Sequence, residues 1–357
     1  MPKVFLAGAN GFLATHILKD LVEESFDVVG TVRSQAKAED VFSAHPEFAS
    51  KVKLVAVPDM SKAGTYDKIF QETQFDYIIH TASPVPDGDG TDFDRDFLGP
   101  AVQGLIQDSN LELLRAAQKY LKTLKHLTFT GSVVNVRNPM EPYDGMVLTS
   151  KDWNQVDPDV ARKMQHRGAS YIISKTLAEK ALWKFVETEK PAFTVSVLTV
   201  PLIIGPPLQR LDQHAFSKGR TNMTSDLFYN TFLKPVTGLD PGTGQPLYTA
   251  YIDVRDLAVL HVQSLTKGTD THRRIIMANP EPFLAKNVLE ILGQRFPDME
   301  DRWASVQAAS IVANKEQDTE HPVKVDDAEA RAVFGETIYR SLSETVIDTA
   351  MKLLEIE

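Results

Sequence analysis

Short apolar runs alternate with longer amphipathic stretches along the first part of the chain. The apolar runs are rich in β-branched residues, and successive positions are apolar instead of alternating with polar ones. Strands that are buried on both faces of a parallel sheet have this pattern. It predicts strands at Lys3–Ala7, Asp27–Val32, Val52–Val57, Tyr77–His80, Leu124–Thr130 and Thr194–Thr199.

The stretches between these strands have the spacing of helices. They predict helices at Phe12–Ser25, Gly64–Thr73, Pro100–Tyr120 and Ser170–Lys190. Strands that alternate with helices in this way build βαβ units. The fold class that we predict is therefore α/β, with a Rossmann-type doubly wound parallel sheet.

The composition changes after Pro201. Glycine and proline gather at Gly205–Pro207 and Gly238–Pro246, which is typical of loops. A strand and a helix return at Tyr248–Leu265, and helices are predicted at Asn287–Phe296 and Ser341–Leu354. We expect a Rossmann domain over residues 1–200, rejoined by residues 248–266, and a smaller, discontinuous C-terminal lobe from residues 201–247 and 267–357.

Composition and charge exclude several classes of protein. The 357 residues are 43% hydrophobic, and no apolar run approaches the ~20 residues that a membrane helix needs. The formal charge of −10, without a basic patch, argues against nucleic acid or an anionic membrane as a partner. The apolar piece before Gly8 is too short for a signal peptide. We expect a soluble, cytoplasmic protein with room for about two domains.

The chain contains no cysteine, which excludes disulfides, thiolate nucleophiles and iron–sulfur clusters. Its nine histidines show no spacing typical of metal ligands, so we expect no metal. The chemistry would then use oxygen and nitrogen groups together with a bound organic cofactor.

The first strand runs into a glycine turn that is followed by a helix. Gly8 permits the tight reversal, Gly11 lets the backbone approach a pyrophosphate, and Ala14 keeps helix and strand close. The free N–H groups of the helix would face the phosphates. This pattern favours a dinucleotide site, and a plain strand–turn–helix connection is the alternative.

The end of the second predicted strand carries no acid that could bind a ribose 2′-hydroxyl. Arg33, Ser34 and Lys37 stand there instead, and such cations can hold a 2′-phosphate. We therefore predict NADP(H), with two solvated cations as the alternative. Asp59, just past the third strand, would contact the adenine amine or merely end the strand in a turn.

The strongest chemical signal combines a serine with a tyrosine–lysine pair. Tyr171 and Lys175 are four residues apart on a predicted helix, so both project from one face. By itself, a tyrosine and a lysine at this spacing would fit a solvent-exposed helix surface equally well. Ser132 follows a central strand at the edge where ligands of such sheets bind. Together the three predict a cleft site.

These residues resemble those of the extended short-chain dehydrogenases/reductases, the NAD-dependent epimerase/dehydratase-like family. The resemblance is closest to NADPH-dependent carbonyl, methylglyoxal and aldehyde reductases and to dihydroflavonol reductase-like enzymes. It covers nearly the whole chain, and the motifs that carry it are the glycine turn, Arg33-Ser34, His80-Thr81-Ala82-Ser83-Pro84, Ser132, Trp153-Asn154, Tyr171/Lys175, Leu177-Ala178-Glu179-Lys180, Pro201, Gly205-Pro206, Val254-Arg255-Asp256 and Ser341–Thr345.

The resemblance implies NADPH-dependent reduction of a ketone or an aldehyde to an alcohol. Tyr171 would donate its phenolic proton to the carbonyl oxygen, Ser132 would hydrogen-bond that oxygen, and Lys175 would lower the pKa of the phenol and hold the nicotinamide ribose. Asn110 completes the implied catalytic set. The implied cofactor-binding residues are Gly8, Asn10, Gly11, Phe12, Leu13, Arg33, Lys37, Asp59, Met60, Thr81, Ala82, Ser83, Tyr171, Lys175, Pro201 and Ile203. The implied substrate-binding residues are Ser132, Val133, Phe93 and Leu202.

The sequence departs from this family at two places. Gly131 stands where relatives often carry a second serine, and Gly104 precedes Asn110 by more positions than usual, which leaves Asn110 in question. His80 fits a structural role as well as a functional one.

Two other functions remain open. One is a nucleotide-sugar epimerase or dehydratase, and the other is a catalytically idle NADP-binding scaffold. The expected partner is a small carbonyl substrate whose identity the sequence does not give, and the protein would be a monomer or a homodimer.

Overall fold

A seven-stranded parallel sheet forms the centre of the computed structural model, which describes residues 1–82, 105–138, 145–164, 167–211, 222–234, 249–299, 302, 322–337 and 339–356. The strands lie in the order β10-β7-β5-β4-β1-β2-β3. Their bounds are β1 (Lys3–Ala7), β2 (Asp27–Val32), β3 (Val52–Ala56), β4 (Tyr77–His80), β5 (His126–Ser132), β7 (Thr194–Val200) and β10 (Arg273–Ile276). The predicted Rossmann-type α/β fold is thus confirmed.

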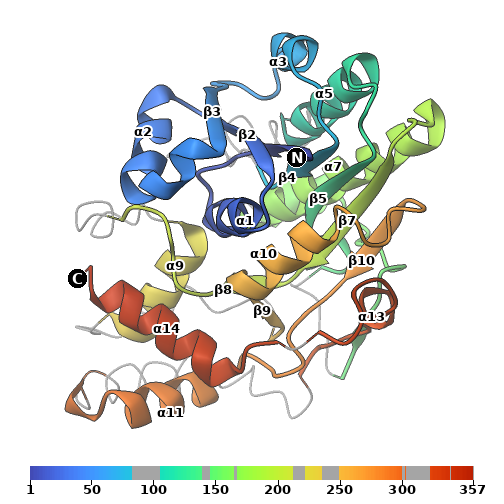
Figure 1. Cartoon of the computed structure of the whole chain (residues 1–357). Coiled ribbons are helices and arrows are strands. Elements are labelled where there is room, and N and C mark those ends of the chain that lie inside the picture. The colour runs from blue at the N-terminus through green and yellow to red at the C-terminus, as the bar shows by residue number, and fades with distance from the viewer. Residues whose placement is uncertain are drawn as a thin grey trace.

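Helices cover both faces of the sheet (Figure 1). On one face Val4 and Leu6 of β1 pack with α1 (Phe12–Glu23), α2 (Gln35–Ala44), α10 (Val254–Gln263) and α13 (Ala328–Phe334). On the other face Phe5 and Ala7 pack with α3 (Asp67–Glu72), α5 (Leu105–Tyr120) and α7 (Arg167–Glu189). Because alternate residues of β1 enter opposite cores, the strand is apolar at successive positions, which is the pattern in the sequence.

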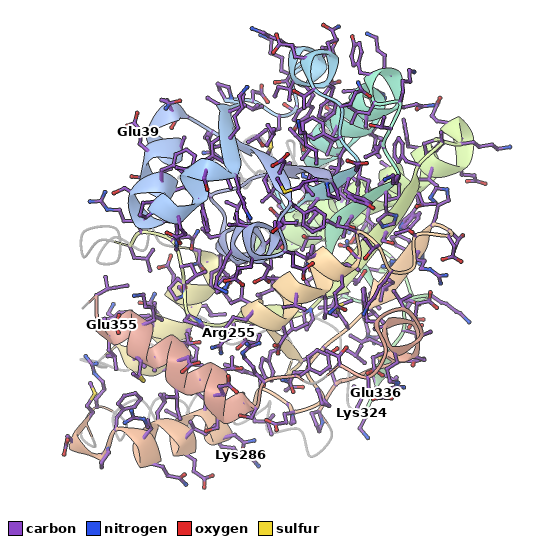
Figure 2. All side chains as sticks on the ribbon, viewed as in Figure 1. Glu39, Arg255, Lys286, Lys324, Glu336 and Glu355 are labelled. Carbon is purple, nitrogen blue, oxygen red and sulfur yellow. The ribbon has the colours of Figure 1, made fainter. Side chains whose placement is uncertain are left out.

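A third apolar core lies under the sheet in Figure 1. It joins β8 (Leu202–Ile204), β9 (Tyr251–Asp253), α9 (Met223–Phe228), the π-helical turn Tyr229–Leu233, α11 (Ala285–Arg295) and α14 (Leu342–Leu354). Arg255, which is labelled in Figure 2, lies at the start of α10. It pairs with Asp253 at 2.8 Å and with Asp348 of α14 at 2.5 Å. This ion-pair cluster fastens the C-terminal helix to the sheet domain.

The remaining described elements are short. They are β6 (Val147–Leu148), which pairs with β11 (Lys324–Val325), α6 (Pro158–Met164), and the 3-10 turns Pro46–Ser50, Val133–Asn135 and Pro297–Met299.

Residues 251–263 lie against the sheet domain through helix α10, which packs with α1, and not through a strand of the large sheet. β9 pairs with β8 in a separate two-stranded sheet. The strand that joins the large sheet is β10, which pairs with β7 although residues 267–357 were assigned to the smaller lobe. Arg273 and Arg274 make half of β10, so the strand lacks the apolar run that marks the others.

Candidate active site

Ser132 is the last residue of β5, at the carboxyl edge of the sheet. The backbone turns there into the 3-10 helix Val133–Asn135, which Ser132 caps by accepting a hydrogen bond from Val134 N at 3.4 Å. Hydrogen bonding by its hydroxyl also acts to lower the pKa of the Tyr171 phenol on α7. Ser132 and Tyr171 are therefore neighbours at the carboxyl edge of the sheet.

Tyr171 and Lys175 are both half-buried on one face of α7. Lys175 Nζ lies 5.8 Å from the centroid of the Tyr171 ring. Burial lowers the pKa of Lys175 to about 8, while the negative charge of Glu179 acts in the opposite direction. The predicted trio of Ser132, Tyr171 and Lys175 is thus brought together.

The pKa of Tyr171 differs from the expectation that Lys175 would lower it. Burial raises the pKa of the phenol, and the hydrogen bond from Ser132 only partly opposes this effect. The chain by itself therefore holds Tyr171 as a neutral phenol, which is the form that can donate a proton.

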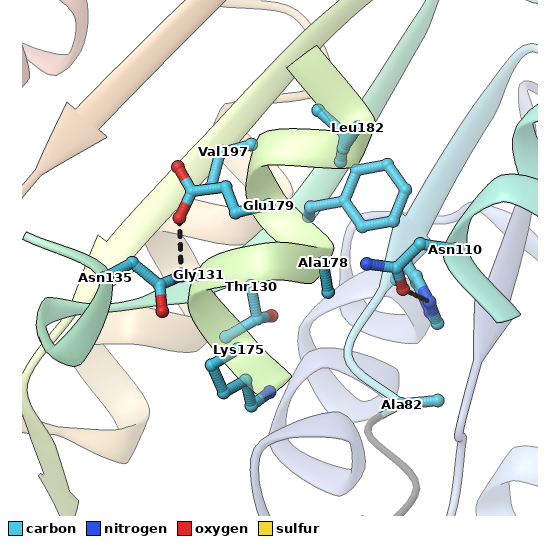
Figure 3. Close-up of a pocket in the computed structure, with 12 residues that line it drawn as sticks. Ala82, Asn110, Thr130, Gly131, Asn135, Lys175, Ala178, Glu179, Leu182 and Val197 are labelled. Atoms are coloured by element: carbon cyan, nitrogen blue, oxygen red, sulfur yellow. Dashed lines mark hydrogen bonds between the residues drawn. The ribbon is translucent and has the colours of Figure 1, made fainter. Parts of the chain in front are cut away.

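Asn110 of α5 shares a cavity with Lys175 (Figure 3). Its side-chain oxygen accepts a hydrogen bond from His80 Nε2 at 2.9 Å. His80, at the end of β4, is fully buried, and burial lowers its pKa to about 4. The unusual spacing of Gly104 and Asn110 therefore does not keep Asn110 away from Lys175, and His80 enters the site as the neutral partner of Asn110.

Glu179 is a buried part of this site to which the sequence analysis assigned no role. Its carboxylate accepts hydrogen bonds from Asn135 at 2.5 Å, shown by the dashed line in Figure 3, and from Arg274 at 2.6 Å. The signal that could have indicated it is its spacing, since Glu179 follows Lys175 by one helical turn.

The glycine turn has the geometry that a dinucleotide needs. Gly8 adopts φ 84°, and a Cβ there would lie 2.8 Å from the Cβ of Ala82, so a side chain at this position would be strained and would clash. The turn is held by a hydrogen bond from Gly8 N to Thr31 Oγ1 at 3.2 Å.

Helix α1 begins directly after Gly11, which caps it without a side-chain hydrogen bond, and its first turn contains no acid. The N–H groups in the first turn of α1 would therefore face a bound pyrophosphate, and Asn10, Phe12 and Leu13 lie beside that position. The residues of the turn therefore fit the nicotinamide dinucleotide that the fold implies.

The cations predicted to select NADP(H) lie beside the start of α2. Arg33 and Lys37 are exposed, and Ser34 is the N-cap of α2 without a side-chain capping bond. Lys37 forms an ion pair with Asp40 at 3.0 Å. The first turn of α2 contains no acid, so two cationic side chains and the positive end of a helix dipole lie at this end of β2.

Asp59 and Met60 lie past β3. Asp59 is exposed, and its Oδ1 accepts hydrogen bonds from Ser61 N at 2.9 Å and from Ser61 Oγ at 2.6 Å. These bonds lower the pKa of Asp59. Through Oδ1, Asp59 therefore stabilises a turn after β3. Such a turn is the alternative to an adenine contact that the sequence leaves open. Met60 packs partly buried against the core that contains Phe5.

The other candidate cofactor residues lie along the same edge of the sheet. Thr81 donates from its hydroxyl to Ala7 O at 3.0 Å, and Ala82 lines the cavity beside Lys175. Pro201 is buried, and Ile203 packs partly buried against the core of the sheet face that carries α1. Ser83 lies outside the described residues.

The candidate substrate residues have different surroundings. Leu202 packs partly buried against the core of the smaller lobe. Val133 is buried in a separate cluster with Val136 and Leu148, so its side chain anchors the 3-10 turn after Ser132 in that cluster. Phe93 lies outside the described residues.

Within the described ranges no three histidine, aspartate or glutamate side chains are grouped so that they could hold a metal ion. No helix in the same ranges combines the length and the apolar character that crossing a membrane requires.

Comparison with known proteins gives consistent matches along the chain. The sequence profile of the NAD dependent epimerase/dehydratase family matches residues 4–277. The chain is 30% identical over 371 residues to the NADPH-dependent methylglyoxal reductase of Saccharomyces cerevisiae, covering 99% of this chain and 98% of that protein. It is 29% identical over 359 residues to a ketoreductase of Aspergillus niger, covering 99% and 98%. The crystal structure of a yeast methylglyoxal/isovaleraldehyde reductase complexed with NADPH superposes with a TM-score of 0.80 at 28% identity, over 99% of this chain and 98% of that one.

Proposed function

The chain belongs to the NAD dependent epimerase/dehydratase family, and on this premise we propose that it is an NADPH-dependent oxidoreductase that reduces a ketone or an aldehyde to an alcohol. The observation that carries the proposal is the contact of Ser132 with Tyr171 one helical turn from Lys175. Relatives over the full length of the chain are named as reductases of carbonyl compounds, which supports the same reaction.

Tyr171, Ser132 and Lys175 would each have a separate role at the carbonyl group. Tyr171 holds a proton on its phenolic oxygen at neutral pH, as an ordinary tyrosine does, and burial raises its pKa further. Ser132 would donate a hydrogen bond to the substrate oxygen and stabilise the negative charge that develops there. A bound nicotinamide cofactor would supply the hydride. As the proton leaves Tyr171, the Lys175 ammonium would stabilise the phenolate.

We propose that the cofactor is NADPH and not NADH. Arg33 and the uncapped start of α2 at Ser34 would hold the 2′-phosphate, with Lys37 shared between that phosphate and Asp40. The pyrophosphate would bind at the start of α1, and residues 1–200 with β10 would form most of the cofactor domain.

The substrate would bind between this domain and the lobe built around Leu202, α9 and α14. The chemical class is a small carbonyl compound. Cytoplasmic location, a monomeric or homodimeric state, and the absence of nucleic-acid and membrane partners stay predictions.

The test is the Tyr171→Phe variant, assayed with NADPH and a panel of small aldehydes and ketones. We expect kcat to fall by about 10²–10⁴-fold, because the proton donor is removed, while quenching of protein fluorescence by NADPH is retained. Undiminished turnover by the variant would contradict the proposal. Tight, non-exchanging NAD in the purified protein would favour a sugar epimerase, and NADPH binding without consumption across the panel would favour an idle scaffold.

A further inference from the structure

The carboxylate of Glu179 is buried one helical turn beyond Lys175, with 4% of its side chain exposed. Tyr171, Lys175 and Glu179 follow one another at intervals of four residues, so a phenol, an ammonium and a carboxylate share one stripe of α7. A buried carboxylate is unfavourable unless it is paired and hydrogen-bonded. Its partners therefore show what this placement achieves.

The two oxygens of Glu179 bind partners from two other elements. Oε2 accepts a hydrogen bond from Asn135 Nδ2 at 2.5 Å, and Oε1 accepts one from Arg274 Nε at 2.6 Å. Asn135 ends the 3-10 turn that Ser132 caps, and Arg274 lies on β10. One carboxylate thus joins the helix of Tyr171 to the segment that follows Ser132 and to the edge strand.

Arg274 is itself held firmly in this position. Its Nη1 donates to the carbonyl oxygens of Ser150 at 2.8 Å and Asp152 at 2.6 Å, and its guanidinium lies 3.9 Å from the centroid of the Trp153 ring. The guanidinium is therefore a fixed positive charge behind Glu179, and it offsets part of the field that the carboxylate exerts on Lys175.

The groups around Lys175 respond differently to pH. The titratable groups that face it from the described residues are Tyr171 and Glu179 on α7 and His80 on β4, and His80 stays neutral because burial lowers its pKa to about 4. Helix α5, the turn after Ser132 and strand β5 present Asn110, Asn135 and Thr130 to the cavity, which do not titrate. Among these groups Glu179 supplies the negative charge.

We propose that Glu179 is a positioning residue whose charge keeps the Lys175 amine protonated at neutral pH, and whose bond to Asn135 keeps the Tyr171 helix in register with Ser132. Burial lowers the pKa of Lys175 to about 8 even with the opposing charge of Glu179 in place, so the amine would lose its proton at a lower pH without that charge. The kinetic consequences rest on the proposed function, but the protonation of Lys175 can be measured without turnover.

Two variants that change the local charge in opposite senses form the test. Glu179→Gln removes the negative charge, and Arg274→Met removes the positive charge that offsets it. The matched control is Arg273→Met, because Arg273 is the neighbouring residue on β10 but pairs with Glu329 at 2.6 Å and with Asp270 at 2.9 Å, away from Glu179.

The first readout is carbamylation of Lys175 by cyanate in the cofactor-free protein, followed by peptide mass spectrometry as a function of pH. Cyanate reacts with the neutral amine, so the midpoint of the rate profile reports when Lys175 loses its proton. We expect this midpoint to fall by about one pH unit in Glu179→Gln and to rise in Arg274→Met. Arg273→Met should keep the wild-type midpoint.

The second readout is the pH profile of kcat/KM with NADPH and a carbonyl substrate. The alkaline limb should move in the same two directions, since the Lys175 ammonium assists proton transfer. Asn135→Ala changes no charge, so it should lower kcat without moving either midpoint. A fall in kcat without a midpoint shift would thus separate the structural role of Glu179, which keeps α7 in register with Ser132, from its electrostatic effect on Lys175.

Equal midpoints in all variants, or shifts of one sign in both Glu179→Gln and Arg274→Met, would overturn the proposal. Circular dichroism would show whether Glu179→Gln folds. If it does not, an upward midpoint shift in Arg274→Met supports the proposal, and an unchanged or lower midpoint contradicts it. Opposite midpoint shifts without any turnover by the wild-type protein would contradict the proposed function and leave this inference standing.

Discussion

His80 Nε2 lies 2.9 Å from the side-chain oxygen of Asn110, and this bond joins the end of β4 to helix α5 beside the Lys175 cavity. Because an amide oxygen only accepts hydrogen bonds, Nε2 carries the proton and donates it. The other ring nitrogen, Nδ1, is buried without a hydrogen-bond partner among the described residues. The orientation of Asn110 in the site therefore depends on a histidine that carries its proton on Nε2.

Replacing Asn110 by leucine should destabilise the protein by about 1–3 kcal/mol, because it leaves the buried Nε2–H of His80 without an acceptor. Urea denaturation measures the change. The double variant His80→Phe/Asn110→Leu removes both partners, so it should lose less stability than the sum of the two single variants. Strict additivity would show that the bond contributes nothing.

Replacing Ser132 by alanine should lower kcat by about 10²–10³-fold, because a hydrogen-bond donor to the developing negative charge is lost. The matched control is Ser174→Ala, since Ser174 donates only to the carbonyl oxygen of Tyr171, at 2.8 Å. Steady-state kinetics of both variants check the prediction. A similar loss of kcat in both would indicate that the helix, and not the hydroxyl of Ser132, is what matters.

Replacing Arg33 by serine should weaken NADPH binding by about 10- to 100-fold, which corresponds to the loss of about 1.5–3 kcal/mol of charge-assisted hydrogen bonding. NADH binding should hardly change. Lys37→Gln should have a smaller effect, because a guanidinium can form two hydrogen bonds with a phosphate while an ammonium acts as a point charge. Fluorescence titration with both cofactors measures the affinities, and equal losses for NADPH and NADH would rule out a role in recognising the 2′-phosphate.

Replacing Gly131 by alanine should destabilise the protein by about 1–3 kcal/mol, because the core must accommodate extra volume. A Cβ at this position would lie 2.7 Å from Val197 Cγ1 and 3.2 Å from Thr199 Oγ1 of β7. This lack of space explains the glycine where the family resemblance implied a second serine.

Two further variants sharpen this prediction. Val197→Ala in the Gly131→Ala background should restore part of the stability, since it removes the clashing methyl group. Gly293→Ala is the control, because nothing lies within 4 Å of its Cβ. In helix α11 it should stabilise the protein by up to about 1 kcal/mol. Thermal denaturation of the set would contradict the steric account if Val197→Ala gave no recovery.

Four buried histidines should make the protein lose stability as the pH falls from 6.5 toward 4. Burial lowers the pKa values of His16, His80, His126 and His261 to about 4 from the ordinary 6.5. Between these values the unfolded chain binds protons that the folded chain does not, so protonation favours unfolding by up to about 3 kcal/mol for each histidine.

Asp20 and Asp256 act in the opposite sense over part of this range, because burial raises the pKa of both carboxyls. Burial raises the pKa of Asp20 to about 6, so its protonation favours the folded chain below that pH. Denaturation curves at several pH values measure the net slope. His126→Asn should reduce that slope by about 1.4 kcal/mol per pH unit, the value for one proton. A slope that is flat in the wild-type protein would contradict the account.

The amino-acid sequence by itself determined the local features of this protein. β1, β2 and β4 lie at the predicted residues, because each is an apolar run that two neighbouring strands and two layers of helices bury. The glycine turn and the pairing of Tyr171 with Lys175 are also local, since each depends on residues within one turn or two turns of helix.

The features that join distant parts of the chain arise only when the chain is folded. The sequence gives no sign that the arginine-rich β10 completes the sheet beside β7, because its place follows from backbone pairing and not from an apolar pattern. Glu179 and Arg274 are 95 positions apart, and neither residue type indicates a buried partner. Their pairing exists because packing α7 against the sheet excludes water, and a carboxylate without water must find a charge and hydrogen-bond donors within the protein.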